Sequence, residues 1–294
     1  MTDRSSSVVV LSPHLDDAVF AVGAFIGSET AAGVPVVVQT IYSGDTAVRA
    51  TTRRQRAFAD YSVRCTEDDE ALRILGASSR RIGLRERLFR PPPLRTPAQI
   101  FRTPRSAGEL GDVDSIQATI HDTLANPGVV VMAPLGVGNH VDHVAVAVAA
   151  LRCAVGNGGV GRIAFYEDFN ALSECSRRRH PVARTAPFPW RDAPGWASPR
   201  SGLGMEAMSL LAAGPAATDY LRQESAGVGL DEWNWIPYTV PAAEYEQVKL
   251  DAVCEYRSQT KVLGGERQLC AMIHRSLARR GGEVVWRLLR RSAR

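Results

Sequence analysis

Long hydrophobic runs are missing from this 294-residue sequence. No stretch approaches the ~18 uninterrupted apolar residues of a transmembrane helix, so we expect no membrane span. The first 17 residues place two carboxylates directly after a short apolar run and lack the features of a secretory signal. Hydrophobic residues make up 45% and charged residues 22% of the chain, which indicates a folded globular protein and excludes a disordered chain, a collagen or a coiled coil.

Lysine is almost absent. Of the 35 basic residues only Lys249 and Lys261 are lysines, so the other 33 are arginines. Arginine pairs bidentately with phosphate, but the net charge is only +4 and the arginines are dispersed, which favours a bias toward arginine codons over a nucleic-acid surface. We expect no nucleic-acid partner. The arginines from Arg287 to the C-terminus are expected at the solvated end of a helix.

Paired cysteines are missing as well. The five cysteines are odd in number, widely spaced and form no C-x-x-C pair, which predicts a reduced, cytoplasmic protein without a disulfide framework.

Alternating strand and helix patterns predict the fold. Residues 7–12 and 36–42 are β-branched runs, and residues 16–29 between them have helix-like apolar spacing, so the chain opens with a βαβ unit. Further strands are expected at 81–84, 129–133 and 162–166, and further helices at 64–75, 114–124, 141–155, 242–256 and 266–279. The pattern predicts an α/β fold: a Rossmann-like, mainly parallel sheet with helices on both faces.

Two long segments interrupt this pattern. Residues 86–112 and 181–240 are rich in proline, and the second also holds four of the five tryptophans. We expect a single domain over residues 1–294, with these segments as loop insertions over the carboxyl edge of the sheet. Because long irregular segments are usually functional, they are expected to form the wall of a substrate pocket.

A short acidic motif follows the first predicted strand. His14 and Asp17 are three residues apart on a turn that enters a helix, so both side chains can face one point, with Asp16 beside them. Imidazole and carboxylate are both suitable ligands for zinc. The alternative is that Asp16 and Asp17 only cap the helix.

A second motif, Gly138 to His143, follows the predicted strand at 129–133. Asn139 can cap the next helix, which would place His140 and His143 on one face of its first turn. By itself this pair could be a solvated helix start. Because both motifs follow strands of one parallel sheet, they are expected to meet at its carboxyl edge and to form a three-ligand metal site with groups left for catalysis.

The two motifs resemble the (P/A)HPDD and HxDH signatures of the LmbE-like/PIG-L family of zinc-dependent N-deacetylases. Three more stretches are similar to the family's R-x-x-E helix, its strand ending in YED and its K…YxSQ segment: they start at Arg64, Tyr166 and Lys249. Leu15 stands where the family usually has proline, and Ala18 where many members have glutamate. Neither is a metal ligand in the family, so these departures leave the site intact.

The resemblance implies the same roles that the chemistry suggests. His14, Asp17 and His143 would hold Zn²⁺, although Fe²⁺ suits these ligands equally, and an open position would bind water. Asp16 would be the general base, and His140 would stabilise the oxyanion. For Asp142 two roles are open, orienting His140 or capping the helix, and capping is favoured.

The family's substrates imply the removal of an acetyl group from an N-acetylated amino sugar, here in natural-product or glycoconjugate biosynthesis. Candidate substrate contacts are Arg54, Arg64, Trp196 and Trp233, although the tryptophans could equally pack beneath their own segment. An amidase acting on a larger amide, such as a thiol conjugate, is an alternative. A non-catalytic Rossmann-like sugar- or nucleotide-binding protein is disfavoured, because no G-x-G-x-x-G loop follows the first strand. The sequence leaves both a monomer and a homo-oligomer open.

Overall fold

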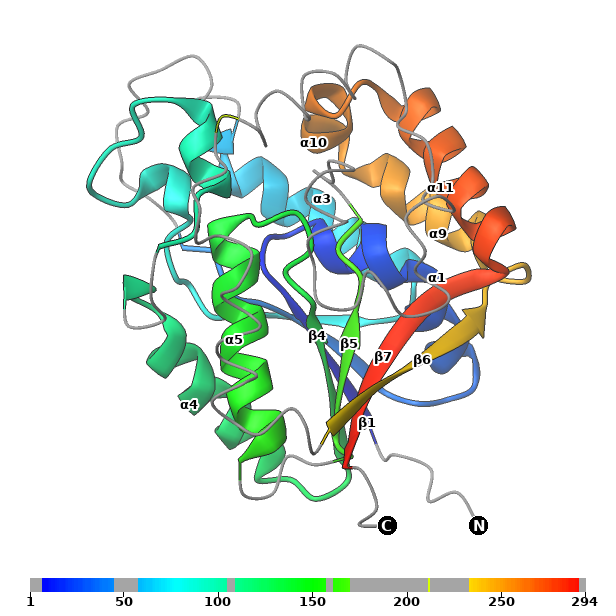
Figure 1. Cartoon of the computed structure of the whole chain (residues 1–294). Coiled ribbons are helices and arrows are strands. Elements are labelled where there is room, and N and C mark those ends of the chain that lie inside the picture. Colours follow the sequence, from blue (N-terminus) through cyan, green and yellow to red (C-terminus); the bar gives the residue numbers. More distant parts are fainter. Residues whose placement is uncertain are drawn as a thin grey trace.

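The computed structural model describes residues 7–44, 58–104, 109–156, 161–169, 211 and 233–290, and within them the strands form one seven-stranded sheet (Figure 1). The strands are β1 Ser7–Ser12, β2 Val36–Thr40, β3 Ser78–Arg81, β4 Val129–Pro134, β5 Ile163–Tyr166, β6 Trp233–Pro241 and β7 Gly282–Arg290. Their order is β3-β2-β1-β4-β5-β7-β6. The first five are parallel, whereas β7 is antiparallel to both β5 and β6. This confirms the predicted mainly parallel sheet.

Helices cover both faces of the sheet, also as predicted (Figure 1). The α-helices are α1 Asp17–Ala31, α3 Tyr61–Ile74, α4 Val113–Leu124, α5 Val141–Val155, α9 Glu246–Glu255, α10 Arg257–Val262 and α11 Glu266–Arg280. Alternate residues of β1 point to opposite faces: Val9 and Leu11 pack in the core with α4 and α5, and Val8 and Val10 in the core with α1, α3, α9 and α11. None of the helices in the described part is long and apolar enough to cross a membrane.

Two predictions about the C-terminal third are wrong. Arg287 and Arg290 are not at a helix end, because Gly282–Arg290 is strand β7. Strand β6 begins within the segment 181–240, which is expected to be irregular. Alternation explains β7: Val284, Trp286 and Leu288 pack in one core, whereas Val285 on the opposite face packs in the other and interrupts the apolar/polar pattern in the sequence. Gly281, at φ 72°, ends α11 in the left-handed conformation and turns the chain into β7.

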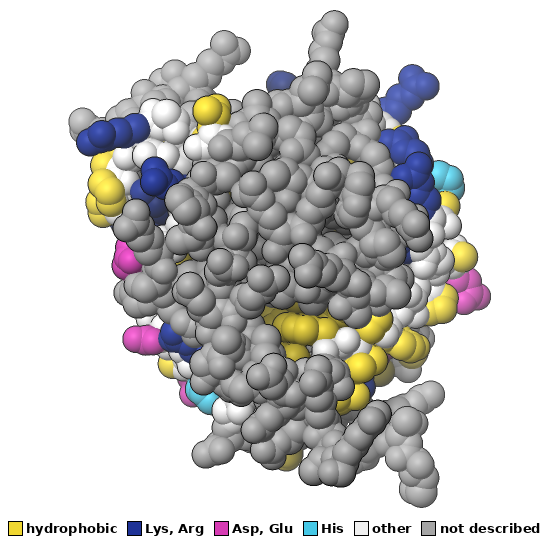
Figure 2. Space-filling view, viewed as in Figure 1, with side chains coloured by type: hydrophobic (Ala, Val, Ile, Leu, Met, Phe, Trp, Pro, Cys, Tyr) yellow, Lys and Arg dark blue, Asp and Glu magenta, His cyan; other side chains and the backbone are white. Residues whose placement is uncertain are grey.

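The segment 86–112 is more ordered than expected where it is described. It contains two short 3-10 helices, η1 Arg87–Phe89 and η2 Pro97–Phe101. On the face seen in Figure 2, the described lysine and arginine side chains lie in separate groups near the rim. The dispersion that the sequence suggested is therefore visible on that face.

Candidate metal centre

The two motifs meet because their strands are neighbours. His14 and Asp17 lie where β1 passes into α1, His140 and His143 lie where β4 passes into α5, and β1 pairs directly with β4. At the first junction, the hydroxyl of Ser12 accepts a hydrogen bond from the backbone N–H of Ala18 at 3.0 Å. The turn that carries the ligating groups is therefore closed by a side chain at the end of the strand.

Three donor atoms converge at this edge. Asp17 Oδ2 lies 3.0 Å from His14 Nδ1 and 3.0 Å from His143 Nε2, and the two nitrogens are 3.3 Å apart. We call these three atoms the donor triangle. Atoms bound tetrahedrally to one Zn²⁺ at ~2.0–2.2 Å lie about 3.3–3.6 Å apart, so the triangle is close to the spacing that a small divalent ion requires. All three residues are at least 92% buried.

His140 lies beside the donor triangle. One nitrogen from each of His14, His140 and His143 falls within 4.8 Å of the others, so this histidine cluster can also hold a metal ion. The ring centroids of His14 and His140 are 4.9 Å apart. The structure thus brings together His14 and Asp17 of the first motif and His140 and His143 of the second.

A carboxylate lies behind each imidazole of the triangle. Asp142 Oδ2 is 3.1 Å from His14 Nε2, and Asp168 Oδ1 is 2.6 Å from His143 Nδ1. Each carboxylate favours the tautomer that carries the proton on its side, which leaves the other ring nitrogen free to bind a metal in the centre. Asp168 is itself held by the backbone N–H of Val137, which donates to its Oδ2 at 2.8 Å.

Asp142 does not have the role that the sequence suggested. Its carboxylate neither caps α5 nor orients His140; besides His14, it accepts a hydrogen bond from the backbone N–H of Arg87 at 2.9 Å and pairs with the guanidinium of Arg90. The cap of α5 is His140, not Asn139: its Nδ1 accepts from the N–H of Asp142 at 3.3 Å, while Asn139 adopts a positive φ of 61°. Asp16, the N-cap residue of α1, makes no side-chain capping bond.

Sequence reasoning assigned no role to two supporting residues. Asp168, the second residue after β5, ends the stretch that resembles the family's YED, so the sequence singled out the residue but not its contact with His143. No sequence pattern pointed to Arg90, which pairs with Asp142. It belongs to the irregular segment 86–112, and the sequence does not show where that segment lies relative to the sheet.

The carboxylates set the pKa values of the site. Burial alone would lower the pKa of His14, but Glu86, Asp142 and Asp17 raise it well above its ordinary value. Burial is likewise overcome at His143, where Asp17 and Asp168 raise the pKa to about 9. These shifts report an excess of negative charge around the donor triangle, which a divalent cation would neutralise.

The pKa values of Asp16 and His140 shift in directions that suit proton transfer by Asp16 and hydrogen-bond donation by His140. Burial and the neighbouring charge of Asp17 raise the pKa of Asp16. Burial, His143 and His14 lower the pKa of His140 well below its usual value, so its ring is neutral. Because its Nδ1 accepts a backbone hydrogen bond, the ring proton is on Nε2.

Of the four predicted substrate contacts, the structure describes Arg64 and the backbone of Trp233, and the charge of Arg64 acts on Asp16 by lowering its pKa. Arg64 is buried, and its guanidinium pairs with Glu86 at 2.6 Å. Trp233 begins β6, which runs parallel to β5 and therefore starts at the edge opposite the donor triangle, so the position of its backbone gives its predicted role no support. Arg54 and Trp196 lie outside the described residues.

The segment 86–112 does reach the metal centre. Besides the contacts of Arg87 and Arg90 with Asp142, the ring of Phe101 meets that of His140 edge to face at 5.8 Å. His140 is only partly buried. His140 therefore lies where a ligand could approach, with the buried Phe101 against its ring.

Comparison with known proteins agrees with this architecture. The family model PIG-L, described as GlcNAc-PI de-N-acetylase, matches residues 9–154. The structure of the A40926 pseudoaglycone deacetylase is similar with a TM-score of 0.63 at 23% identity, covering 99% of this chain and 100% of that chain. A zinc inhibited form of teicoplanin deacetylase (TM-score 0.60) and a deacetylase–teicoplanin complex from the teicoplanin pathway (0.59) are each 18% identical, covering 98% of this chain and 100% of theirs. At these identities the likeness shows a shared fold. Among curated proteins nothing matches significantly.

Proposed function

Because residues 9–154 of this chain belong to the PIG-L family of GlcNAc-PI de-N-acetylases, we propose that the protein is a metal-dependent hydrolase that removes the acetyl group from an N-acetylated amino sugar. The observation that carries this proposal is the donor triangle of His14, Asp17 and His143, with Asp16 and His140 beside it. An amide hydrolase needs a metal or an oxyanion site next to a base, and these five residues supply the parts.

The donor set fits Zn²⁺. Two imidazole nitrogens and one carboxylate oxygen are the ligands of many catalytic zinc sites, and Fe²⁺ accepts the same set. The carboxylates behind His14 and His143 add the outer support that such sites usually have. When bound, the ion would polarise the acetyl carbonyl and lower the pKa of water.

The remaining work falls to Asp16 and His140. In this proposal Asp16 takes a proton from the attacking water and delivers it to the amine as the C–N bond breaks. Its raised pKa favours both halves of that transfer near neutral pH. The neutral His140 ring donates a hydrogen bond from its Nε2–H to the carbonyl oxygen, which becomes negative during the attack.

We propose a natural-product glycoside as the substrate class. Two structural relatives are a deacetylase of the A40926 pseudoaglycone and one complexed with teicoplanin, and both match over nearly the whole chain. The contacts of Arg87, Arg90 and Phe101 support a role for the segment 86–112 in forming the wall of the acceptor pocket. The single-domain organisation and the cytoplasmic location remain predictions.

Acetate release is the decisive test. The purified protein, loaded with Zn²⁺ or Fe²⁺, is incubated with N-acetylglucosaminyl compounds that carry alkyl, aryl or glycopeptide aglycones, and with an N-acetylated thiol conjugate. We expect acetate from the glycosides, the best kcat/KM with a bulky aglycone, and no turnover after chelation. Turnover of the thiol conjugate alone would establish the amidase alternative, and metal binding without any acetate release would reject the proposal.

A further inference from the structure

Helix α1, which begins at the metal centre, is broken in its middle. Val22 has φ −129° and ψ 29°, outside the helical range, although the helix continues on both sides. In a regular helix the N–H of Phe25 would donate to the carbonyl of Ala21. Here side chains from two other elements contact both of these groups.

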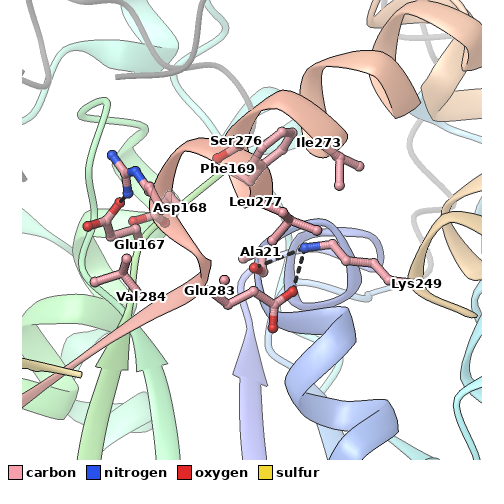
Figure 3. A pocket seen from close by; sticks show the side chains of 12 residues that line it. Ala21, Glu167, Asp168, Phe169, Lys249, Ile273, Ser276, Leu277, Glu283 and Val284 are labelled. Carbon is pink, nitrogen blue, oxygen red and sulfur yellow. Dashed lines mark hydrogen bonds and ion pairs between the residues drawn. The ribbon is translucent and has the colours of Figure 1, made fainter. Parts of the chain in front are cut away.

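Lys249 of α9 and Glu283 of β7 fill the break (Figure 3). Lys249 Nζ donates to the carbonyl of Ala21 at 3.2 Å and to Glu283 Oε1 at 2.6 Å. The carboxylate of Glu283 accepts from the N–H groups of Ala24 at 3.0 Å and Phe25 at 2.7 Å. An ion pair thus stands where one turn of backbone hydrogen bonds would otherwise lie.

The fit of this ion pair is close. The side chains of Lys249 and Glu283 are 1% and 2% exposed. Gly23 gives the lysine its space, because a Cβ at that position would lie 2.9 Å from Lys249 Cγ. In a chain whose other basic residues are nearly all arginine, a lysine stands here. Its compact ammonium suits a single carbonyl and a single carboxylate oxygen better than a planar guanidinium would.

The contacts of Lys249 lie at the end of the first turn of α1, and this turn carries the metal-binding carboxylate. Asp17 opens the helix, and Ala21 closes its first turn. Ser12 holds the start of that turn through the N–H of Ala18, and Lys249 holds its end through the carbonyl of Ala21. Asp168, which contacts His143, lines the same pocket as Lys249 and Glu283, so the support of His143 and the ion pair lie around one pocket (Figure 3).

We propose that Lys249 and Glu283 are positioning residues that hold the break in α1 and thereby place Asp17 in the donor triangle. This inference rests on the proposed function, because that function requires a metal ion bound at the donor triangle. It goes beyond that function by assigning a role to a buried ion pair that touches none of the three donors. Loss of the pair should weaken metal binding in protein that is still folded.

The test compares Lys249→Met and Gly23→Ala with the wild type, using Lys261→Met as the matched control because Lys261 is the chain's other lysine and is exposed. Zn²⁺ affinity is measured by competition with a chromophoric chelator, at a temperature where circular dichroism shows every variant to be folded. We expect Kd to rise about 10-fold or more in the first two, as for other outer supports of metal sites. The kcat for acetate release should fall while KM stays within about two-fold, and Lys261→Met should match the wild type.

Gly23→Ala keeps both charges and only crowds the lysine, so it tests the same idea if Lys249→Met does not fold. Wild-type Zn²⁺ affinity in folded Gly23→Ala or Lys249→Met, with only a lower Tm, would show a purely structural pair and overturn the inference. A wild type that binds no metal would instead overturn the proposed function, and the inference with it. The two failures are therefore distinguishable from the wild-type titration alone.

Discussion

Two buried clusters of charged side chains in this protein differ in how their charge is balanced. In the Lys249–Glu283 cluster, one ammonium meets one carboxylate, and backbone groups take up the remaining hydrogen-bonding capacity. Around the donor triangle, carboxylates face imidazoles, and the pKa values of His14 and His143 rise in response. The first arrangement is complete without a ligand, whereas the second is completed by a cation.

Burial of charge therefore does not by itself identify a reactive site in this protein. Both clusters are almost entirely withdrawn from solvent. What separates them is the surplus of one sign and the convergence of donor atoms on a single point.

Asp16→Asn should separate chemistry from metal binding. Because Asp16 lies beside the triangle and is not one of its three donor residues, we expect the variant to keep its metal and its fold, and to lose ~10²–10⁴ in kcat. Metal content by elemental analysis and acetate release measure the two properties independently. As the matched control, Asp17→Asn should lose metal. Near wild-type turnover in Asp16→Asn would remove Asp16 from the mechanism.

Asp68 extends the comparison to a carboxylate buried away from the triangle. Burial raises its pKa to about 7, although Tyr256 and Arg81 oppose the shift. A carboxyl with a raised folded pKa favours folding while it is protonated, so its contribution is complete below about pH 4 and is lost as pH rises toward 7. The gap between about 4 and about 7 corresponds to at most about 4 kcal/mol.

The measurement is urea unfolding of the wild type and Asp68→Asn across pH 4–8. We expect the free energy of unfolding of the wild type to fall relative to that of the variant between pH 4 and 7 and to run parallel above. Asp69→Asn, which changes the half-exposed neighbour and leaves Asp68 in place, is the control and should keep the fall seen in the wild type. Parallel curves for wild type and Asp68→Asn would mean that Asp68 is ionised in the folded protein throughout.

Asp168→Asn tests the support behind His143. The amide can still accept a hydrogen bond, but it no longer offers the charge that favours the proton on His143 Nδ1. We expect Zn²⁺ affinity to fall ~10–100-fold with the fold intact. Asp142→Asn should act similarly through His14 and should also loosen the segment 86–112, since Arg87 and Arg90 both contact Asp142. Unchanged affinity in both variants would show that the imidazoles hold their orientation without these carboxylates.

The core of the fold and the central motifs were predictable from sequence because they depend on local patterns. The β-branched runs at β1, β2 and β4 and the spacing of His14, Asp17, His140 and His143 follow from strand ends alone. The helix Val141–Val155 was assigned correctly despite its alternating pattern, because its length and alanine content outweigh the alternation.

What could not be predicted depends on contacts between distant segments. Strand β7 pairs with β5 and β6, and Val285 interrupts its apolar/polar alternation. Asp142 was assigned to the nearest helix terminus, whereas its partners His14 and Arg90 are 128 and 52 residues away. The break in α1 has no signal at Val22 itself, because it is held by residues more than 220 positions further along the chain.

The smallest effect should come from an ion pair at the surface. Arg73 Nε and Glu70 Oε2 are 2.8 Å apart on one face of α3, with side chains that are 70% and 49% exposed. Water and salt screen such a pair, and its formation immobilises two long side chains, so its net contribution is close to zero. Arg73→Met should therefore leave Tm and Zn²⁺ affinity unchanged within error, even though its contact is nearly as short as that between Lys249 and Glu283. A clear loss of stability would show that distance, and not burial and charge balance, determines which ion pairs matter in this protein.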